Sequence, residues 1–542
     1  MKIHLRFVAT SGFCLLLALL AGSPGLAQIQ APPRAPSPPT SPSSVVPHRV
    51  EVSRPALEGE MQRDSQMKRL EQSVVAQGRR VSISGNASNL QVSAVAGDEV
   101  RIVVELEYWS NNADWMAAVD RDFEIEIDET SREIEIGFTD VSDLAEEGWI
   151  RRMIGTRTVS FEMEVTIEVP TATPLSIDNR YGDVTVDEVG GPVELSNTSG
   201  QVEVIGAKGE AEIDNRYGDV FVTQTDGDLT LDSTSGEVEV TNVSGSADIS
   251  NQYGAVVVEG IGGRLDLRAT SCEVSVSGAQ DVVNVDNSYG DVLLTSITGQ
   301  VDVDLTSGNV RIESAHDDVR LSTSYGSIEI VDVEGTLIMQ ASSVEGEIRQ
   351  ISGALEVESS YGDLLIEEVG GTVTVTNTSG GVTLTSAGGD TDITISYAAA
   401  RVDGVNGSLR VSGTSAAVQA SNITGPVDVE TSYEGVRLTE IGGSVTVHNQ
   451  SGRVEVSGLS GAALSASHTV ETSYADIEFF WPASAVIPGY RLEASYGQIT
   501  CDFPGTTEER GSRQFREGEG AAAGAPSIDL TTQSGSIMLR QR

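Results

Sequence analysis

The chain has 542 residues, with 34 Lys and Arg against 80 Asp and Glu, which gives a formal net charge of −46 at pH 7. A charge this negative disfavours nucleic acids and anionic membranes as partners, because like charges repel. The 57 glycines and the period-two patterns described below exclude a mainly helical protein.

Residues 1–27 have the pattern of a secretory signal peptide. Lys2 and Arg6 precede an apolar run from Phe13 to Ala21, and a small residue, Ala27, follows as a cleavage site. The run is too short to span a bilayer comfortably, and Cys14 lies inside it, which argues against a lipoprotein. We therefore expect an exported protein, periplasmic, cell-surface or extracellular, with no membrane insertion after cleavage.

Two segments precede the repeats. Residues 28–71 begin with a stretch rich in proline and serine, which predicts an extended linker. Residues 72–174 contain longer alternating runs and are expected to form a β-rich cap over the first coil. Within this cap we expect a short helix at 113–121, and a loop or second helix at 140–157, which includes Trp149 and Ile150.

Residues 175–457 repeat every 18 residues without an insertion. Tyrosine recurs every 36 residues and serine stands midway, so one column, the Tyr/Ser column, alternates through sixteen positions. Its tyrosines are Tyr181, Tyr217, Tyr253, Tyr289, Tyr325, Tyr361, Tyr397 and Tyr433. Its serines are Ser199, Ser235, Ser271, Ser307, Ser343, Ser379, Ser415 and Ser451. Such strict phasing is typical of a stacked-repeat fold.

Each 18-residue unit predicts two strands and two corners. We number the residue after the Tyr/Ser column as position 0; β-branched residues then alternate at positions 2 and 4, and apolar residues at 11 and 13. Glycine dominates position 9, with Asp281 and Asp317 as exceptions, and predicts a left-handed corner there. The second corner is expected at the Tyr/Ser column and the glycine after it. The prediction is an all-β, parallel β-solenoid whose coils pair in register about 4.8 Å apart.

The Tyr/Ser column has two interpretations. Position 17 shares its parity with positions 11 and 13, which predicts an inward side chain and a large–small packing ladder. On that interpretation Ser307→Tyr destabilises the stack by about 1–3 kcal/mol through overpacking. The alternative is an exposed aromatic track for sugars. Asn at position 15, as in Asn179 and Asn197, predicts a partial ladder of amides hydrogen-bonded from coil to coil.

Little in the repeats indicates catalysis or metal binding. Acidic residues recur at position 1, but the stripe is interrupted by Gln201, Ala255 and Ser327, so a solvated face is favoured over a calcium site. Its members are Asp183, Asp219, Glu237, Glu273, Asp291, Glu345 and Asp363. No HExxH, CxxC, GxSxG or P-loop pattern occurs, and uninterrupted coils leave no loops to wall a cleft. We expect no catalytic, cofactor-binding or metal-binding residues, and no cofactor.

The lone cysteines and histidines favour structural interpretations. Cys272 stands in the position-0 column and Cys501 far beyond the regular coils, which argues against a disulfide. His316 and His448 are isolated in the repeats and are expected to be structural.

Residues 458–542 are expected to form irregular terminal coils and a cap. The 18-residue phase breaks after Gly452, and the next motif tyrosines are Tyr474 and Tyr496. Phe479-Phe480-Trp481-Pro482 predicts a terminal hydrophobic lid, with an exposed patch as the alternative. Residues 505–525 are expected to be a polar loop, and Ser527–Leu539 a last strand.

The alternating motifs resemble those of a bacterial family of candidate adhesins, a domain of unknown function expected to be a β-solenoid. They are Glu168-Val169-Pro170, then Asn179-Arg180-Tyr181-Gly182-Asp183 and Asn197-Thr198-Ser199-Gly200. The resemblance covers about residues 72–542. It implies an architecture and supplies no catalytic residues.

From these observations we expect a non-enzymatic, exported β-solenoid of the cell envelope or cell exterior that acts as an adhesion or binding surface. A surface glycan or a protein is the expected ligand. One alternative is a structural or self-assembling scaffold like the bactofilins. A polysaccharide-active β-helix enzyme is less favoured.

Overall fold

The computed structural model describes residues 65–141, 144, 159–521 and 525–542. The chain divides into two units, Met1–Gln62 and Arg63–Arg542, and all described residues belong to the second. The predicted signal peptide, most of the linker and nearly all of 140–157 therefore lie outside the described residues. Within the part of the chain that is described, no helix is both long and apolar enough to cross a bilayer.

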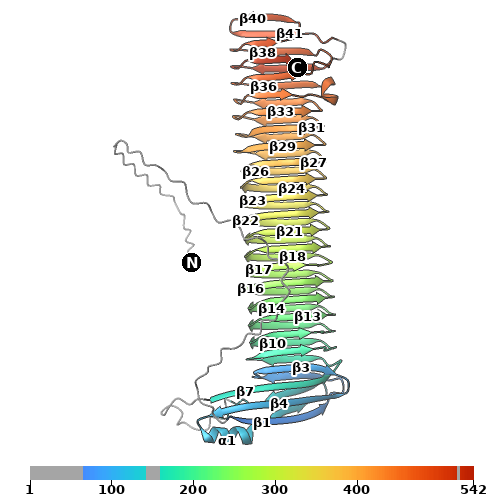
Figure 1. Ribbon diagram of the computed structural model, residues 1–542, viewed down its shortest axis with the longest axis vertical. Coiled ribbons are helices and arrows are strands. Elements are labelled where there is room, and N and C mark those ends of the chain that lie inside the picture. Colours follow the sequence, from blue (N-terminus) through green and yellow to red (C-terminus); the bar gives the residue numbers. More distant parts are fainter. Residues whose placement is uncertain (1–64, 142–143, 145–158, 522–524) are drawn as a thin grey trace, which may run out of the picture. The chain divides into compact units, whose positions relative to one another are not determined.

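The second unit is a parallel β-solenoid of about 16 turns of about 18 residues, which confirms the predicted fold class (Figure 1). Strands in adjacent coils pair in register at a separation of 18 residues, as Val220 does with Val238 and Val202. The regular strands are β8(Leu175–Asn179), β9(Asp183–Asp187), β10(Val193–Ser199), β11(Val202–Ile205), β12(Ala211–Tyr217), β13(Val220–Thr225), β14(Leu229–Ser235), β15(Val238–Val243), β16(Ala247–Ile261), β17(Leu265–Ser277), β18(Val283–Tyr289), β19(Val292–Ile297), β20(Val301–Ser307), β21(Val310–Ala315), β22(Val319–Val333), β23(Leu337–Ile351), β24(Leu355–Tyr361), β25(Leu364–Val369), β26(Val373–Ser379), β27(Val382–Ala387), β28(Thr391–Ile395), β29(Ala399–Val405), β30(Leu409–Gly413), β31(Ala417–Ile423), β32(Val427–Thr431), β33(Val436–Ile441), β34(Val445–Asn449) and β35(Val454–Ser457).

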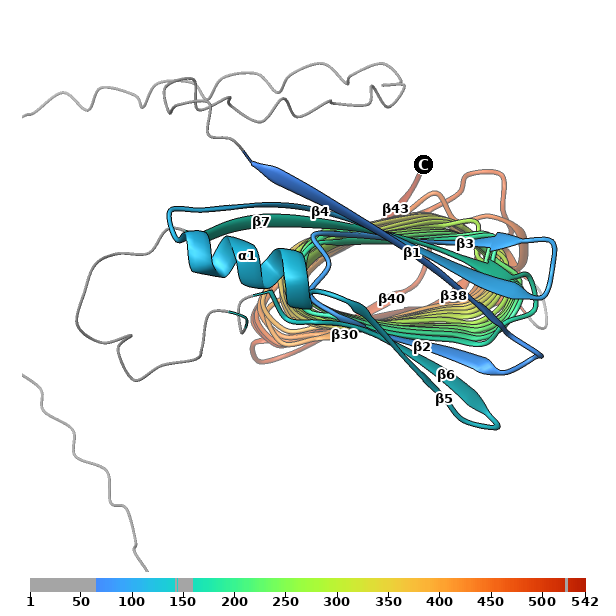
Figure 2. The same cartoon turned by 90° about the horizontal axis from the view of Figure 1, so that it is seen from below.

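Seen along its axis, each coil is a flattened ring with two long sides and two narrow ends (Figure 2). The inward residues of both long sides are mostly valine, leucine and isoleucine, and they are almost fully buried, as Val220, Val222 and Leu231 show. Coil after coil these side chains form one continuous core, which explains why β-branched residues recur at the same positions.

The left-handed corner lies at position 6 rather than at position 9, so the sequence prediction for position 9 was wrong. Position 6 has φ between 52° and 80° whether it is glycine or not, as in Gly206, Gln224 and Asn242. Glycine recurs at position 9 because the backbones of adjacent coils lie very close together there. A Cβ on Gly209 would lie 2.8 Å from the carbonyl carbon of Gly191 in the preceding coil. Backbone contact between coils, and not a positive φ, selects glycine there.

The N-terminal end of the stack is covered by a β-rich cap. β2 and β3 extend the two long sides beyond β8 and β9. β7 pairs with β3 in parallel, β4 and β1 follow as antiparallel strands, and β1 runs obliquely across the end of the stack (Figure 2). The cap contains β1(Gln66–Val75), β2(Arg80–Gly85), β3(Asn89–Val95), β4(Glu99–Ser110), α1(Ala113–Asp122), β5(Ile125–Glu129), β6(Glu133–Phe138) and β7(Val159–Pro170). The observed α1 confirms the predicted short helix.

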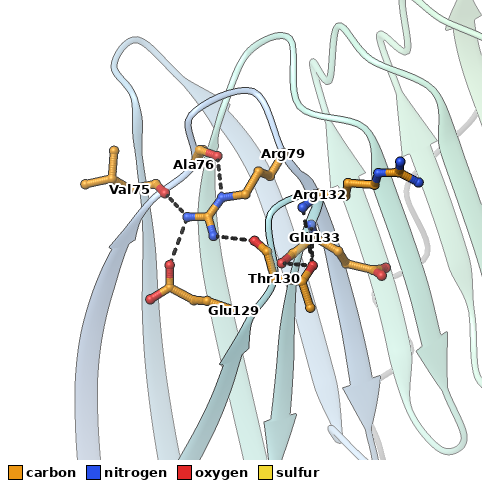
Figure 3. Close-up of polar contacts among 7 residues, drawn as sticks. All are labelled: Val75, Ala76, Arg79, Glu129, Thr130, Arg132 and Glu133. Atoms are coloured by element: carbon orange, nitrogen blue, oxygen red, sulfur yellow. Dashed lines mark hydrogen bonds and ion pairs between the residues drawn. The ribbon is translucent and has the colours of Figure 1, made fainter.

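Arg79 ties two turns of this cap together (Figure 3). Its guanidinium donates to the carbonyl oxygens of Val75 at 2.6 Å, Ala76 at 3.1 Å and Thr130 at 3.1 Å, and it pairs with Glu129 at 2.9 Å. The β1–β2 turn is thereby joined to the β5–β6 turn. Three carbonyl oxygens that no strand uses obtain a charged donor.

The C-terminal end has a different chain path from the regular stack. β36 and β37 pair with β42 and β43, and these in turn pair with β38 and β39, so strands late in the sequence lie inside the stack. The antiparallel hairpin of β40 and β41 follows β38 at the outer end. The elements are η3(Gly461–Ser465), β36(Ser467–Thr472), β37(Ile477–Trp481), β38(Gly489–Ala494), β39(Ile499–Cys501), β40(Thr506–Arg510), β41(Arg513–Gly518), β42(Ser527–Thr532) and β43(Ile537–Gln541).

Two predictions for this end were wrong, and a third is confirmed in part. The expected loop at 505–525 contains the β40–β41 hairpin, and the expected single strand at 527–539 is two strands, because a Ser-Gly corner at Ser534 and Gly535 divides it. The aromatic cluster is buried, as expected for a lid: Phe479 and Trp481 are fully buried, and the Trp481 indole donates to the carbonyl oxygen of Val486 at 3.1 Å. It is not terminal, however, because β37 lies inside the stack between β35 and β43.

Candidate binding surface

The column tyrosines are exposed, so the predicted inward packing ladder was wrong. Between 54% (Tyr253) and 76% (Tyr496) of each tyrosine is accessible to solvent. The exposed set, which we call the tyrosine ladder, is Tyr181, Tyr217, Tyr253, Tyr289, Tyr325, Tyr361, Tyr397, Tyr433, Tyr474 and Tyr496. The alternative interpretation, an exposed aromatic track, is the one that the structure supports.

The parity rule fails because the Tyr/Ser column stands at a corner. In β12 the burial alternates through Asn215, which is buried, but Arg216 and Tyr217 are then both exposed. Gly218 follows with φ 129°, and a Cβ there would lie 2.1 Å from the carbonyl oxygen of Gly200. Backbone from the preceding coil thus occupies the inner side of this corner, which leaves no room for a ring and turns the tyrosine outward.

Buried asparagines hold the corner from inside. Asn215 Nδ2 donates to the carbonyl oxygens of Gly200 at 3.3 Å and Gly218 at 2.9 Å, which are the position-0 residues of two successive coils. The same bridge to the preceding coil recurs at Asn197, Asn251, Asn287, Asn377 and Asn449. Among the residues that the structure describes, the predicted bond between successive asparagine amides is present once, between Asn179 and Asn197 at 3.4 Å. The asparagines mainly satisfy carbonyl groups that the corner leaves without a strand partner.

The alternation of tyrosine and serine continues where the sequence phase breaks. Beyond Ser451 the next coil presents Tyr474, the inserted coil of β42 and β43 presents Ser534, and the outer coil presents Tyr496. Backbone hydrogen bonds at the corner join these coils in the same order. Ser534 N donates to Ser473 O at 2.9 Å, and Tyr496 N donates to Gln533 O at 2.8 Å. Ser534 was missed from the sequence, although Gln533-Ser534-Gly535 has the motif of a serine coil.

Crowding does not explain this alternation. Tyrosines on successive coils would lie about 4.8 Å apart, and exposed rings at such a distance can stack favourably. Serine between them instead sets the period of the ladder at two coils, or about 9.6 Å. Among the described residues, no close ring pair and no side-chain hydrogen bond engages the ring or hydroxyl of a ladder tyrosine, so both are available to a ligand.

The ladder is flanked by acidic side chains. Asp183, Asp219, Asp291 and Asp363 each stand two residues after a ladder tyrosine and are exposed. Each carboxylate accepts a backbone N–H of the next coil at 2.7–2.9 Å, which leaves the charge beside the aromatic column. In the described ranges, no group of three or more His, Cys, Asp or Glu could hold a metal ion. Exposed Arg180 and Arg216 precede the first two tyrosines, and acidic residues outnumber basic ones beside the others, so the surface is aromatic and mainly negatively charged.

The other candidate groups have structural surroundings. Cys272 is buried at position 0 with its thiol near the carbonyl oxygen of Asn251, burial raises its thiol pKa, and both Cys272 and Cys501 are free. His316 contacts the carbonyl oxygen of Ile297, and exposed His448 pairs with Glu471. A depression of about 620 Å³ at the position-6 corner is lined by glycines and by mainly polar side chains of both charges, among them Glu188, Lys208 and Asp226.

The comparison with protein families identifies the chain. The Toastrack DUF4097 model matches residues 62–281, 262–352 and 355–540. The chain belongs to the Toastrack family. The resemblance inferred from the Tyr-Gly-Asp and Ser-Gly motifs, a family of unknown function, is thereby confirmed. No curated protein matches the chain.

Two solved structures are similar to parts of this Toastrack chain. One is a candidate cell adhesion protein from Clostridium sporogenes, with 8% identity and a TM-score of 0.13, covering 88% of this chain and 100% of its own. The other is a candidate adhesin from Parabacteroides distasonis, with 11% identity and a TM-score of 0.12, covering 70% of this chain and 97% of its own. At these scores neither likeness carries an argument about function.

Proposed function

We propose that this Toastrack protein is an exported, non-enzymatic adhesion protein whose tyrosine ladder is the binding surface. The observation that carries the proposal is the exposure of ten tyrosines in one column, each more than half accessible. A folded protein seldom exposes large aromatic side chains in a contiguous pattern unless they bind something. Export rests on the signal-peptide pattern of residues 1–27.

The geometry of the ladder favours a linear, repetitive ligand. Equal steps of about 9.6 Å let successive repeat units of an extended polymer meet successive rings. Each aromatic contact contributes only about 0.5–1.5 kcal/mol, but contacts along one chain act together, so four in line contribute about 2–6 kcal/mol. Such a surface suits attachment to a polysaccharide or an extended polypeptide.

The scaffold alternative has less support. A rod that stacks end to end requires open strand edges at both ends, whereas antiparallel strands cover each end of this stack. The outermost strand β40 is exposed along its whole length and carries Glu508, Glu509 and Arg510, charges of the kind that blunt an edge.

The test is a triple substitution on the ladder, Tyr253→Ser, Tyr289→Ser and Tyr325→Ser. These changes leave the core untouched, so the protein keeps its stability while attachment of cells that express it to surface polymers falls at least tenfold. Leu293→Ser is the matched control, because Leu293 is a 37% exposed apolar residue on the same coils outside the ladder. Equal attachment by the triple variant and the control would refute the proposal.

A further inference from the structure

We propose that the ligand of the tyrosine ladder is a polyproline II segment with proline at every third residue, and that a second copy of this chain supplies one. This inference rests on the proposed function, since it names the ligand class of the same surface. A regular spacing of prolines precedes the repeats in the sequence: Pro33, Pro36, Pro39 and Pro42 recur every three residues.

The two periods match. A polyproline II helix has three residues per turn and a rise of 3.1 Å per residue, so residues three apart lie on one face about 9.3 Å apart. The tyrosines recur at two coil spacings, about 9.6 Å. Over the three steps from Pro33 to Pro42 the mismatch accumulates to only about 1 Å, and four prolines meet four tyrosines.

The chemistry of the two surfaces is complementary. Proline-rich segments bind aromatic-lined surfaces because the rings pack on the pyrrolidine faces, and the preformed helix loses little entropy on binding. Polyproline II leaves its carbonyl groups without internal partners. Each ladder hydroxyl can donate a hydrogen bond to one of them, and the small serine between two tyrosines leaves room for the intervening residues.

Charge favours the same pairing. Residues 28–56 contain three arginines and one glutamate, a net charge of +2 in a chain whose total is −46. Arg34 stands within the proline repeat, and the ladder is flanked by Asp183, Asp219, Asp291 and Asp363. Because opposite charges attract, this segment of one copy is drawn to the ladder of another, and added salt weakens the attraction.

Binding is tested with a fluorescent peptide of residues 31–43. The receptor is the full chain carrying Pro33→Ser, Pro36→Ser, Pro39→Ser and Pro42→Ser, so that its own segment does not compete. Fluorescence anisotropy should show saturable binding that weakens as salt is raised. A control peptide of the same composition, with its prolines moved out of the three-residue spacing, should bind at least tenfold more weakly. Equal binding of the two peptides overturns the proposal.

The site is tested by adding the ladder changes Tyr253→Ser, Tyr289→Ser and Tyr325→Ser to that receptor. Ten tyrosines contain seven runs of four, and these changes leave two of them, so peptide affinity should fall about threefold, whereas Leu293→Ser should leave it unchanged. An affinity unaffected by the tyrosine changes overturns the assignment of the peptide to the ladder.

The occupant is tested by sedimentation of the full chain over a range of concentrations. The unaltered chain should associate as concentration rises, and the variant with four serines should stay monomeric. A monomer at all concentrations, or association that persists in the variant, overturns the second copy as the occupant. Failure here is distinguishable from failure of the proposed function: if the peptide does not bind but polysaccharide attachment still requires the tyrosines, the adhesion surface stands and the polyproline ligand does not.

Discussion

The regular coils from Tyr181 to Ser451 and the C-terminal coils from β36 onward present the same column in different ways. In the regular coils the order along the chain equals the order in space. In the C-terminal coils it does not, because β42 and β43 lie between coils that precede them in the sequence. Tyrosine and serine nevertheless alternate through both regions. The alternation therefore follows spatial position, which duplication of a 36-residue unit alone would not produce.

The largest difference between the regular coils and the C-terminal coils is expected when residues 527–542 are removed. The inserted coil buries Ile528, Leu530, Ile537 and Leu539 completely, and their burial contributes about 6–12 kcal/mol to the C-terminal region. We expect β36–β39 to lose protection in hydrogen exchange while the regular coils keep theirs. Replacing the peripheral residues 505–519 by a short turn is the control and should leave β36 and β37 protected. Retained protection of β38 in the truncated chain would contradict the observed strand order.

A methyl group at the corner glycine should be costly in both regions. A Cβ on Gly236 would lie 2.1 Å from the carbonyl oxygen of Gly218, and one on Gly535 would lie 1.9 Å from that of Ala475. Gly236→Ala and Gly535→Ala should each lower the free energy of unfolding by about 2–4 kcal/mol. Gly137→Ala, whose Cβ meets nothing nearer than 3.9 Å, is the control. Denaturant unfolding measures all three, and a neutral Gly535→Ala would show that the two corners differ.

Acid should affect the C-terminal coils selectively. His468 is buried against Phe479 and Trp481, accepts from Val445 N and contacts the carbonyl oxygen of Ala463, and burial lowers its pKa from 6.5. The folded state therefore holds this imidazole neutral, and the unfolded state takes up a proton first as pH falls. Stability is complete above about pH 6.5 and falls below it by up to about 1.4 kcal/mol per pH unit, until the lowered pKa is passed.

The fluorescence of Trp481 reports this transition, because its ring lies 5.9 Å from that of His468. His468→Gln should flatten the pH dependence between pH 6.5 and the lowered pKa. An unchanged pH profile in His468→Gln would exclude this histidine as the cause.

The smallest effect on stability is expected for tyrosine in place of a column serine. Ser307 and Ser534 lie at the outward corner, so Ser307→Tyr and Ser534→Tyr should each change the free energy of unfolding by no more than about 0.5 kcal/mol. This reverses the expectation from inward packing. Ser307→Tyr should nonetheless weaken binding of the proline-rich peptide, because it fills the gap that sets the two-coil period. If Ser307→Tyr instead lowered the free energy of unfolding by about 2 kcal/mol, the inward packing of the Tyr/Ser column would be supported.

Most of the fold could be predicted from the sequence, because the same side-chain environment recurs every 18 residues. Val220, Val238 and Val256 share one environment, and their repetition defines both the inward face and the register. The direction of Tyr217 could not be predicted from parity, because alternation holds along a strand and ends where Gly218 turns the backbone. The inserted coil was missed because parallel pairing was assumed to follow sequence order, although the motif at Ser534 and Gly535 indicates a serine coil.

The insertion of β42 and β43 also bears on the order in which the coils can close during synthesis. A chain that emerges from its N-terminus can add regular coils one by one, each onto the edge of the last. Beyond β37 this progression halts. β38 and β39 emerge next, but they pair with β42 and β43, which emerge later. The edge at β36 and β37 stays open until residues 527–541 have emerged, and the last two coils then close in one step. Closure of that end therefore reports that residues 527–541, which complete it, have emerged.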